Sequence, residues 1–143
     1  MSKVQLPFGM QDYLPDDCYN KVKTESAICN TFSSYGYKRV CTPTLEYADL
    51  FTSDGMMSEK RLFKLTDTDG SLLAMRTDVT MQICRMYVTS MSGVQRMYYA
   101  SDSFEFLDDS NSARDREFAQ TGVELIGDTG ADGELEILTM AVD

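Results

Sequence analysis

The chain has 143 residues, the length of one ordinary domain. Its composition, 43% hydrophobic and 25% charged, predicts a packed core and excludes general disorder. Lys and Arg total 13 and Asp and Glu total 23, so the formal net charge is −10, which disfavours binding to nucleic acid and to anionic membranes. The start is not that of a signal peptide, and no apolar run reaches the ~20 residues of a membrane span, so we expect a cytoplasmic protein.

The sequence contains no histidine, which excludes a histidine general base, a Ser-His-Asp triad and every histidine-ligated metal site. Neither GxxxxGK[ST] nor GxGxxG occurs, so the common phosphate-binding loops are absent. The run DTDG at residues 67–70 fails as a calcium loop, because the last ligand position would be Arg76. We therefore expect no metal and no cofactor.

Cysteine usage points to a reducing compartment. The four cysteines are widely spaced and none belongs to a CxxC pair, which is typical of buried structural thiols and not of a zinc site or a disulfide framework. They are Cys18, Cys29, Cys41 and Cys84.

The predicted elements begin with an irregular N-terminal arm that contains Pro7 and Gly9. A long helix is predicted over residues 15–35, because Pro15 suits a first helical turn and Gly36 suits the position after the last turn. Its apolar residues recur at roughly helical spacing; they are Val22, Ile28, Phe32 and Tyr35.

Short elements follow the first helix. Residues 37–42 are rich in strand formers and end at Pro43, and residues 45–52 are compatible with a brief helix. Residues 61–66 and 71–76 flank the DTDG turn and predict a hairpin.

The second half of the chain predicts a helix, two long strands and a final helix. Thr77 or Asp78 could cap a helix over residues 79–91. Two strands are predicted over 94–107 and 114–126, joined by an acidic, polar connection. The last helix, residues 132–143, has Leu135, Leu138 and Val142 at helical spacing. This order of elements predicts an α+β fold with a largely antiparallel sheet.

One strand carries a candidate ligand-binding pattern. Gln120, Gly122 and Glu124 share a face of the second long strand, because side chains alternate along a strand. Glu124 would attract a ligand amine, Gln120 could hydrogen-bond to it, and Gly122 would let the ligand approach the strand closely. An ordinary solvent-exposed face is the alternative, and the spacing alone does not separate the two.

Four segments resemble class II aminoacyl-tRNA synthetases of the histidyl-tRNA synthetase subgroup. Residues 35–46 (YGYKRVCTPTLE) resemble motif 1, residues 73–80 (LAMRTDVT) the amino-acid loop, and residues 114–127 (RDREFAQTGVELIG) the limb after motif 2. The opening at 8–15 (FGMQDYLP) matches the family's usual start. The resemblance implies an incomplete class II synthetase-like antiparallel sheet with flanking helices, with residues 1–143 as the N-terminal part of the catalytic-core domain.

One departure from the family pattern bears on catalysis. Motif 2 of a working synthetase carries Phe-Arg-x-Glu, whose arginine contacts the ATP α-phosphate and the amino-acid carboxylate. Here the matching residues are Phe104, Glu105, Phe106 and Leu107, so the arginine is lost at Glu105. A carboxylate at ~4 Å from a phosphate repels it by roughly 4 kcal/mol at an effective dielectric near 20. The resemblance therefore implies a protein that is not an enzyme.

The residues that match the family's histidine-amine pocket persist. They are Asp78 (in place of the family's Glu), Thr80, Gln120 and Glu124. By the same resemblance, Arg114 and Arg116 serve the ligand carboxylate or the adjacent surface.

A chain that keeps an amino-acid pocket and loses ATP chemistry resembles the synthetase paralogues that act as regulatory subunits of ATP phosphoribosyltransferase. This likeness implies activation of a short-form catalytic subunit, feedback by L-histidine on the first step of histidine biosynthesis, and a homodimer formed through residues 15–43. A divergent histidyl-tRNA synthetase fragment and an orphan amino-acid-binding paralogue remain the alternatives.

Overall fold

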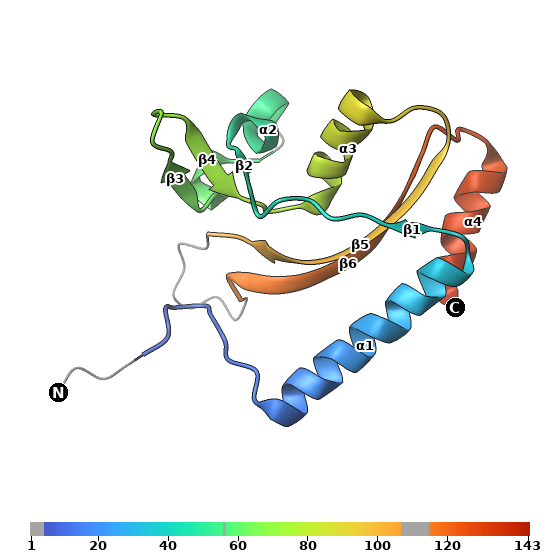
Figure 1. Ribbon diagram of the computed structural model, residues 1–143, viewed down its shortest axis with the longest axis horizontal. Helices are drawn as coiled ribbons and strands as arrows, with labels where there is room; N and C mark the ends of the chain where they lie inside the picture. The colour runs from blue at the N-terminus through green and yellow to red at the C-terminus, as the bar shows by residue number, and fades with distance from the viewer. Residues whose placement is uncertain (1–4, 56, 107–114) are drawn as a thin grey trace.

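The computed structural model describes residues 5–55, 57–106 and 115–143 and arranges them as two three-stranded sheets with flanking helices (Figure 1). In chain order the elements are α1 (Pro15–Ser34), β1 (Lys38–Arg39), β2 (Leu45–Tyr47), α2 (Asp49–Thr52), β3 (Lys64–Thr66), β4 (Leu72–Met75), α3 (Val79–Ser90), β5 (Gln95–Phe104), β6 (Glu117–Ile126) and α4 (Ala131–Val142), with 3-10 turns at Ser53–Gly55 and Glu59–Arg61. The architecture is α+β, as the order of predicted elements implied.

The larger sheet has the strand order β1-β5-β6. Strands β5 and β6 form a long antiparallel hairpin in which ten residue pairs run from Gln95↔Ile126 to Phe104↔Glu117, and the short β1 lies parallel to β5. Because paired residues point to the same side of a sheet, this register decides which side chains of β5 and β6 share a face.

The two faces of the hairpin are covered by different helices. Figure 1 shows α3 and the smaller sheet on one side of β5 and β6, and α1 on the other. On the first side, α3 and β5 share a buried apolar cluster made of Val79, Ile83, Met97 and Tyr99. On the second side, Phe32 of α1 contacts Tyr98 of β5, with ring centroids 6.0 Å apart.

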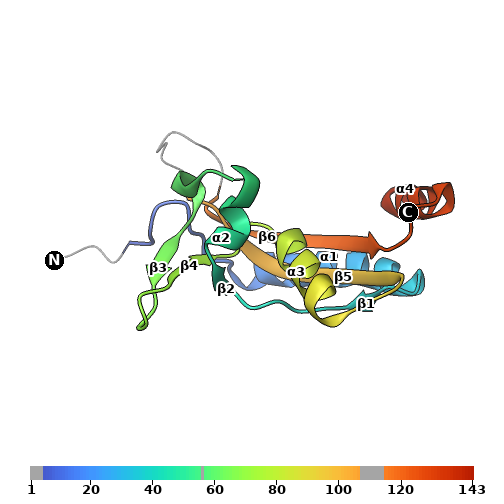
Figure 2. The same cartoon turned by 90° about the horizontal axis from the view of Figure 1, so that it is seen from above.

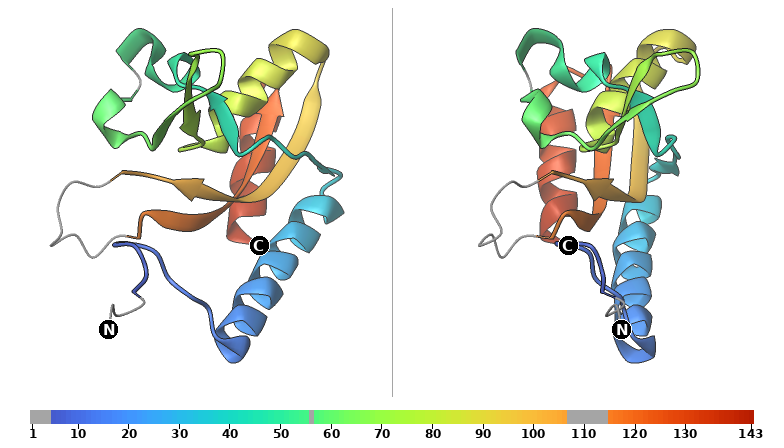
Figure 3. Two further views of the ribbon diagram at one scale, coloured as in Figure 1. Left: turned by 60° about the vertical axis from the view of Figure 1, so that its left-hand side comes forward. Right: turned by 90° about the vertical axis from the view of Figure 1, so that its left-hand side faces the viewer.

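The smaller sheet has the antiparallel order β2-β4-β3 and lies beside α2, as the turned views show (Figures 2 and 3). It has its own apolar cluster, which consists of Ala48, Phe51, Leu62 and Ala74. The chain leaves this sheet through β4 and enters α3 within three residues, so the smaller sheet fixes where α3 begins.

Most predicted elements are confirmed, and the first short ones need correction. The brief helix expected over residues 45–52 is wrong in its first half, where Leu45–Tyr47 forms β2 and only Asp49–Thr52 is helical. The reason is tertiary pairing, because β2 pairs with β4, far along the chain. The strand expected over 37–42 shortens to Lys38–Arg39.

The prediction of buried cysteines is wrong for three of the four. Only Cys29 is buried, whereas Cys18, Cys41 and Cys84 are exposed, and all four are free thiols. Cys18 and Cys84 belong to α1 and α3, and their exposure is not revealed by spacing in the sequence.

The final helix is confirmed, but its most regular apolar stripe does not face the sheet. Leu135, Leu138 and Val142 are 62–87% exposed, while Gly133 and Met140 are the buried positions of α4. Gly133 lets α4 lie close to the sheet, because a Cβ at this position would lie 3.1 Å from both the Asp128 side chain and the Leu125 side chain of β6. Helical spacing predicted the helix correctly, and the contact with β6 decides which of its sides is buried.

A three-residue polar contact joins α4 to the sheet. Glu136 accepts hydrogen bonds from Arg96 Nε and Nη2 of β5, at 2.8 and 2.7 Å, and from the buried Tyr37 hydroxyl, at 2.8 Å. These bonds favour the ionised carboxylate, so they hold the pKa of Glu136 below its usual value, with Arg96 as the main cause. Burial, followed by the bond to Glu136, raises the pKa of Tyr37.

We predict that Glu136→Gln lowers the free energy of unfolding by about 1 kcal/mol at pH 7. Because the pKa of Glu136 is depressed in the folded chain, this stabilisation is present above the unfolded pKa and is lost as the pH falls through the folded pKa. Urea denaturation at several pH values measures it. Glu134→Gln, an exposed position on the same helix, is the matched control. A loss in the variant that stays constant down to pH 3 would contradict the assignment.

Candidate functional site

The N-terminus of α3 is capped by Asp78. Of the two predicted caps, Asp78 performs the role: its Oδ1 accepts a hydrogen bond from the backbone N–H of Thr80 at 2.9 Å. This geometry holds the Asp78 carboxylate beside the first turn of α3, next to the hairpin face formed by β5 and β6.

The face of β6 predicted from spacing turns toward this capped end. Glu124 Oε1 accepts a hydrogen bond from the Thr80 hydroxyl at 2.7 Å, and the Gln120 amide donates to Asp78 Oδ1 at 3.4 Å. The structure thus brings together the four residues that the sequence singled out, from two elements about 40 residues apart. We call Asp78, Thr80, Gln120 and Glu124 the acidic site.

Two residues of β5 belong to the surroundings of the acidic site and were missed from the sequence. Ser103, fully buried, donates its hydroxyl hydrogen to Gln120 Oε1 at 2.7 Å and so orients the amide. Tyr99 is paired with Gly122, and a Cβ on Gly122 would lie 2.6 Å from the Tyr99 hydroxyl oxygen. Gly122 therefore makes room for Tyr99, and the close approach of a ligand that its spacing suggested stays a prediction. The register of the hairpin is the signal that would have found both residues.

The electrostatics of the site are dominated by two carboxylates. Burial raises the pKa of Glu124, the hydrogen bond from Thr80 opposes this, and the Asp78 charge raises the pKa further. Burial is also the main cause that raises the pKa of Tyr99 and of the neighbouring Cys84 thiol, with Asp78 and Glu124 adding to both. No ion pair joins Asp78 or Glu124 to a lysine or arginine within the described residues. The arrangement suits a ligand that brings a positive charge.

Of the two arginines predicted for the ligand carboxylate or the adjacent surface, only Arg116 belongs to the described residues, and it lies apart from the acidic site. Arg114 falls outside the described residues. Arg116 precedes Gln120 by four positions, about 13 Å along the strand. Its guanidinium lies over the rings of Phe8 and Phe106, 4.7 and 4.6 Å from their centroids, and its backbone N–H donates to Gly9 O at 2.7 Å. Arg116 thereby ties the N-terminal arm to the hairpin.

At the lost motif 2 position, the structure holds an internal ion pair. Glu105, whose side chain is 13% exposed, accepts hydrogen bonds from the Arg61 guanidinium. The two segments are also joined through their backbones, since the N–H of Phe106 donates to Arg61 O at 2.8 Å. The Arg61 guanidinium is thereby bonded to a carboxylate within the fold. Leu107 lies outside the described residues.

Two further findings concern membrane-spanning helices and metal-binding groups among the described residues. None of their helices is both long and apolar enough to cross a bilayer. In the same part of the chain, no group of three or more Cys, Asp and Glu side chains is arranged to hold a metal ion.

The fold and the acidic site define a domain of the class II aminoacyl-tRNA synthetase type. The histidyl-tRNA synthetase family model matches residues 9–143, and the chain belongs to that family.

Solved structures of this family are similar over nearly the whole chain. An ATP phosphoribosyltransferase regulatory subunit/histidyl-tRNA synthetase from Bacillus halodurans is 32% identical with a TM-score of 0.79, and the match covers 99% of this chain and 37% of that one. The apo histidyl-tRNA synthetase of S. aureus is 25% identical with a TM-score of 0.80, covering 97% of this chain and 33% of that one.

Curated relatives named as regulatory subunits of ATP phosphoribosyltransferase are similar over nearly the whole chain. ATP phosphoribosyltransferase regulatory subunits from Ruminiclostridium cellulolyticum and Moorella thermoacetica are each 37% identical, over 99% and 98% of this chain. The chain spans about a third of their length, 34% and 37% respectively.

We predict opposite shifts of the Glu124 pKa in two variants. Thr80→Val removes the hydroxyl that stabilises the ionised carboxylate, so the pKa rises; Asp78→Asn removes a negative charge while keeping a side chain that can cap α3, so the pKa falls. NMR titration of the carboxyl carbons measures both, with the exposed Glu134 as the internal reference. Shifts of the same sign in both variants would contradict this account of the site.

Proposed function

We propose that the chain is part of a non-catalytic regulatory subunit of ATP phosphoribosyltransferase, with L-histidine as its effector. The proposal rests on a contrast between the acidic site and the position of the motif 2 arginine. The acidic site keeps four residues that suit an amino-acid amine, while the position of the motif 2 arginine holds Glu105, paired with Arg61. The names of the curated relatives support this assignment.

The acidic site would bind the α-ammonium group of histidine. A charged amine has up to three N–H donors, and Glu124, Gln120 and Asp78 offer acceptor oxygens from two converging elements. Charge-assisted hydrogen bonds of this kind contribute about 1.5–3 kcal/mol each. The ligand would supply the cation that the two carboxylates lack.

Loss of adenylate chemistry follows from charge. An ATP phosphate would find no free cation at the position of the motif 2 arginine, because Glu105 stands there and the Arg61 guanidinium is already bonded to that carboxylate. The subunit would therefore act through a partner, a short-form catalytic subunit that it activates. Histidine feedback then requires that the effector bind the active and inhibited states of the complex with different affinity.

A second copy of the chain would pack against residues 15–43. Helix α1 leaves apolar side chains in solvent in this segment; Tyr19 is 66% and Val22 is 56% exposed. An isologous two-fold contact is the commonest oligomer geometry and would cover these side chains in both copies.

We predict that the 143-residue chain binds L-histidine and that Glu124→Gln weakens this binding about tenfold to a hundredfold, because a charge-assisted bond becomes a neutral one. Isothermal titration calorimetry measures the affinity. Glu134→Gln removes one negative charge from an exposed position, and this variant should bind histidine as tightly as the unmodified chain does. The calorimetry is accompanied by a thermal-shift screen of the unmodified chain with each amino acid. If an amino acid other than histidine stabilises the chain most, the orphan amino-acid-binding alternative is favoured.

The complex can be tested in a chimera in which residues 1–143 replace the matching third of the Ruminiclostridium cellulolyticum relative. We predict that this chimera co-elutes with a short-form ATP phosphoribosyltransferase, raises its activity and makes it sensitive to histidine, and that Glu124→Gln removes only the histidine sensitivity. Histidine-dependent ATP–pyrophosphate exchange by the chimera would instead identify a divergent histidyl-tRNA synthetase.

We predict that Val22→Lys dissociates the dimer, because it places a charge in an apolar contact that is repeated by the two-fold axis. Sedimentation equilibrium measures the mass. Leu138→Lys introduces the same charge at a similarly exposed apolar position of α4, outside residues 15–43, and should leave the dimer intact. A monomer in the unmodified chain, or dissociation by Leu138→Lys alone, would place the contact elsewhere or remove it.

A further inference from the structure

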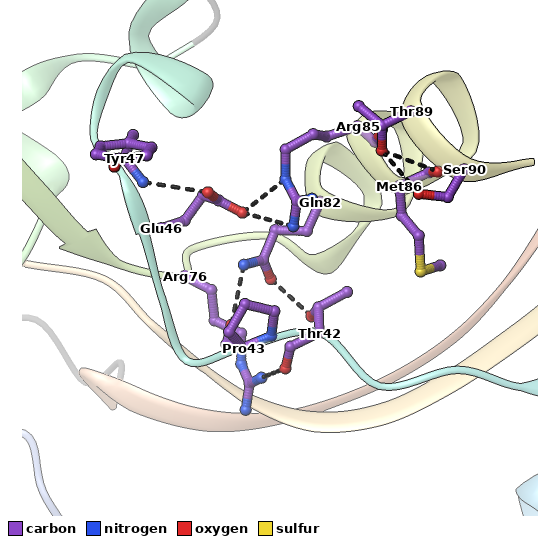
Figure 4. Close-up of polar contacts among 10 residues, drawn as sticks. All are labelled: Thr42, Pro43, Glu46, Tyr47, Arg76, Gln82, Arg85, Met86, Thr89 and Ser90. Carbon is purple, nitrogen blue, oxygen red and sulfur yellow. Dashed lines mark hydrogen bonds and ion pairs between the residues drawn. The ribbon is translucent and has the colours of Figure 1, made fainter.

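A buried amide joins α3 to the segment that precedes β2. Gln82 of α3 is fully buried; its Oε1 accepts a hydrogen bond from the Thr42 hydroxyl at 2.7 Å, and its Nε2 donates to Pro43 O at 2.9 Å (Figure 4). Both halves of the amide are therefore used, and both partners lie on the same short segment. A group satisfied on both sides in a closed interior fixes the distance between two elements more strictly than apolar contact does.

Two arginines reinforce this connection. Arg76, 9% exposed, lies where β4 leads into α3 and donates from Nη1 to Thr42 O at 2.9 Å and from Nε to Asp102 O of β5 at 2.6 Å. Arg85, one turn after Gln82 on α3, donates to Glu46 from Nε at 2.8 Å, and its Nη2 lies 2.7 Å from the same carboxylate oxygen (Figure 4). Residues 42–46 are thus tied both to the start of the β4–α3 connection, through Arg76, and to the middle of α3, through Gln82 and Arg85.

The acidic site begins on that same connection. Asp78 caps α3, Thr80 lies in its first turn, and Gln82 is two residues further on the same rigid helix. The Thr80–Glu124 bond is 2.7 Å long, so a displacement of the first turn by roughly 1 Å would carry the two oxygens beyond hydrogen-bond distance.

We propose that Gln82 is a positioning residue of the acidic site, which acts by anchoring the first turn of α3 to Thr42 and Pro43 and thereby keeps Thr80 on Glu124. Arg76 supports the same anchor from the strand side. The role is independent of what the site binds; only its effect on affinity rests on the proposed function.

The anchor also joins the segment proposed to contact a second copy to the acidic site. Thr42 and Pro43 end the segment assigned to the contact with a second copy, and Gln82 links them directly to the helix that carries Thr80. A displacement of residues 42–43 would therefore reach Glu124 through one helical turn.

Two variants loosen the anchor from opposite sides. Gln82→Met preserves the approximate length of the side chain and removes both hydrogen bonds, while Thr42→Val is nearly isosteric and removes one of them. We expect both to raise the Glu124 pKa, Gln82→Met more than Thr42→Val, because the Thr80 bond that favours the ionised carboxylate weakens. Asp78, Tyr99 and Cys84 face the same carboxylate, so their titrations are followed in the same NMR experiment.

A control on the opposite side of the sheet distinguishes a positioning role of Gln82 from a general contribution to stability. Met140→Ala in α4 removes a buried side chain, 3% exposed, and destabilises the chain without touching α3. We expect the Glu124 pKa to stay unchanged in this control. Histidine affinity should fall about tenfold in Gln82→Met and should not change in Met140→Ala.

The outcomes separate the two proposals. An unchanged or lowered Glu124 pKa in the folded anchor variants overturns the role of Gln82, and so does an equal rise in Met140→Ala. If Gln82→Met does not fold, Thr42→Val decides by the same criterion. If the unmodified chain binds no histidine, the proposed function fails, while the Glu124 titration, which needs no ligand, still decides whether Gln82 positions the site.

Discussion

The pairing of β5 with β6 is the interaction on which the rest of the molecule depends. Ten consecutive antiparallel pairs place Tyr99 and Ser103 on the same face as Gln120 and Glu124. A shift of the β5–β6 register by one residue would move Gln120 and Glu124 to the opposite face. The opposite face is reserved for α1 and α4, whose contacts with Tyr98 and Arg96 require the same register. The register of the hairpin therefore determines both the position of the acidic site and the packing of α1 and α4.

Thr80 connects the two halves of the acidic site in a way that few residue types could. Its backbone N–H serves the Asp78 carboxylate and its hydroxyl serves Glu124, so one residue at a helix start contacts both negative charges. Burial and the mutual repulsion of the carboxylates oppose ionisation of Glu124, and the Thr80 hydroxyl favours it. Opposing effects thus act on the ionisation of Glu124. An incoming ammonium group would stabilise the ionised carboxylate, which the single hydrogen bond from Thr80 stabilises only in part.

Local patterns predicted most of this fold, and contacts distant in sequence account for the errors. The period of two along β6 was sufficient to place Gln120 and Glu124 on one face, and family resemblance added Asp78 and Thr80. Nothing local marks Gln82, whose partners lie about 40 residues earlier, or the burial of Tyr99 against Gly122. The strand β2 was missed for the same reason, since its residues are extended only because β4 lies beside them.

The distribution of paired charges is itself an argument that the acidic site has a function beyond stability. Glutamates that join separate elements are hydrogen-bonded to arginines, as in Glu46–Arg85, Glu105–Arg61 and Glu136–Arg96. These pairs are complete within the fold. Asp78 and Glu124, by contrast, lie together with no ion pair to a cation within the described residues, an arrangement that destabilises a partly buried site until a cation arrives. The described residues form six ion pairs, and none of them includes Asp78 or Glu124, so a positively charged ligand at the acidic site would balance these two carboxylates.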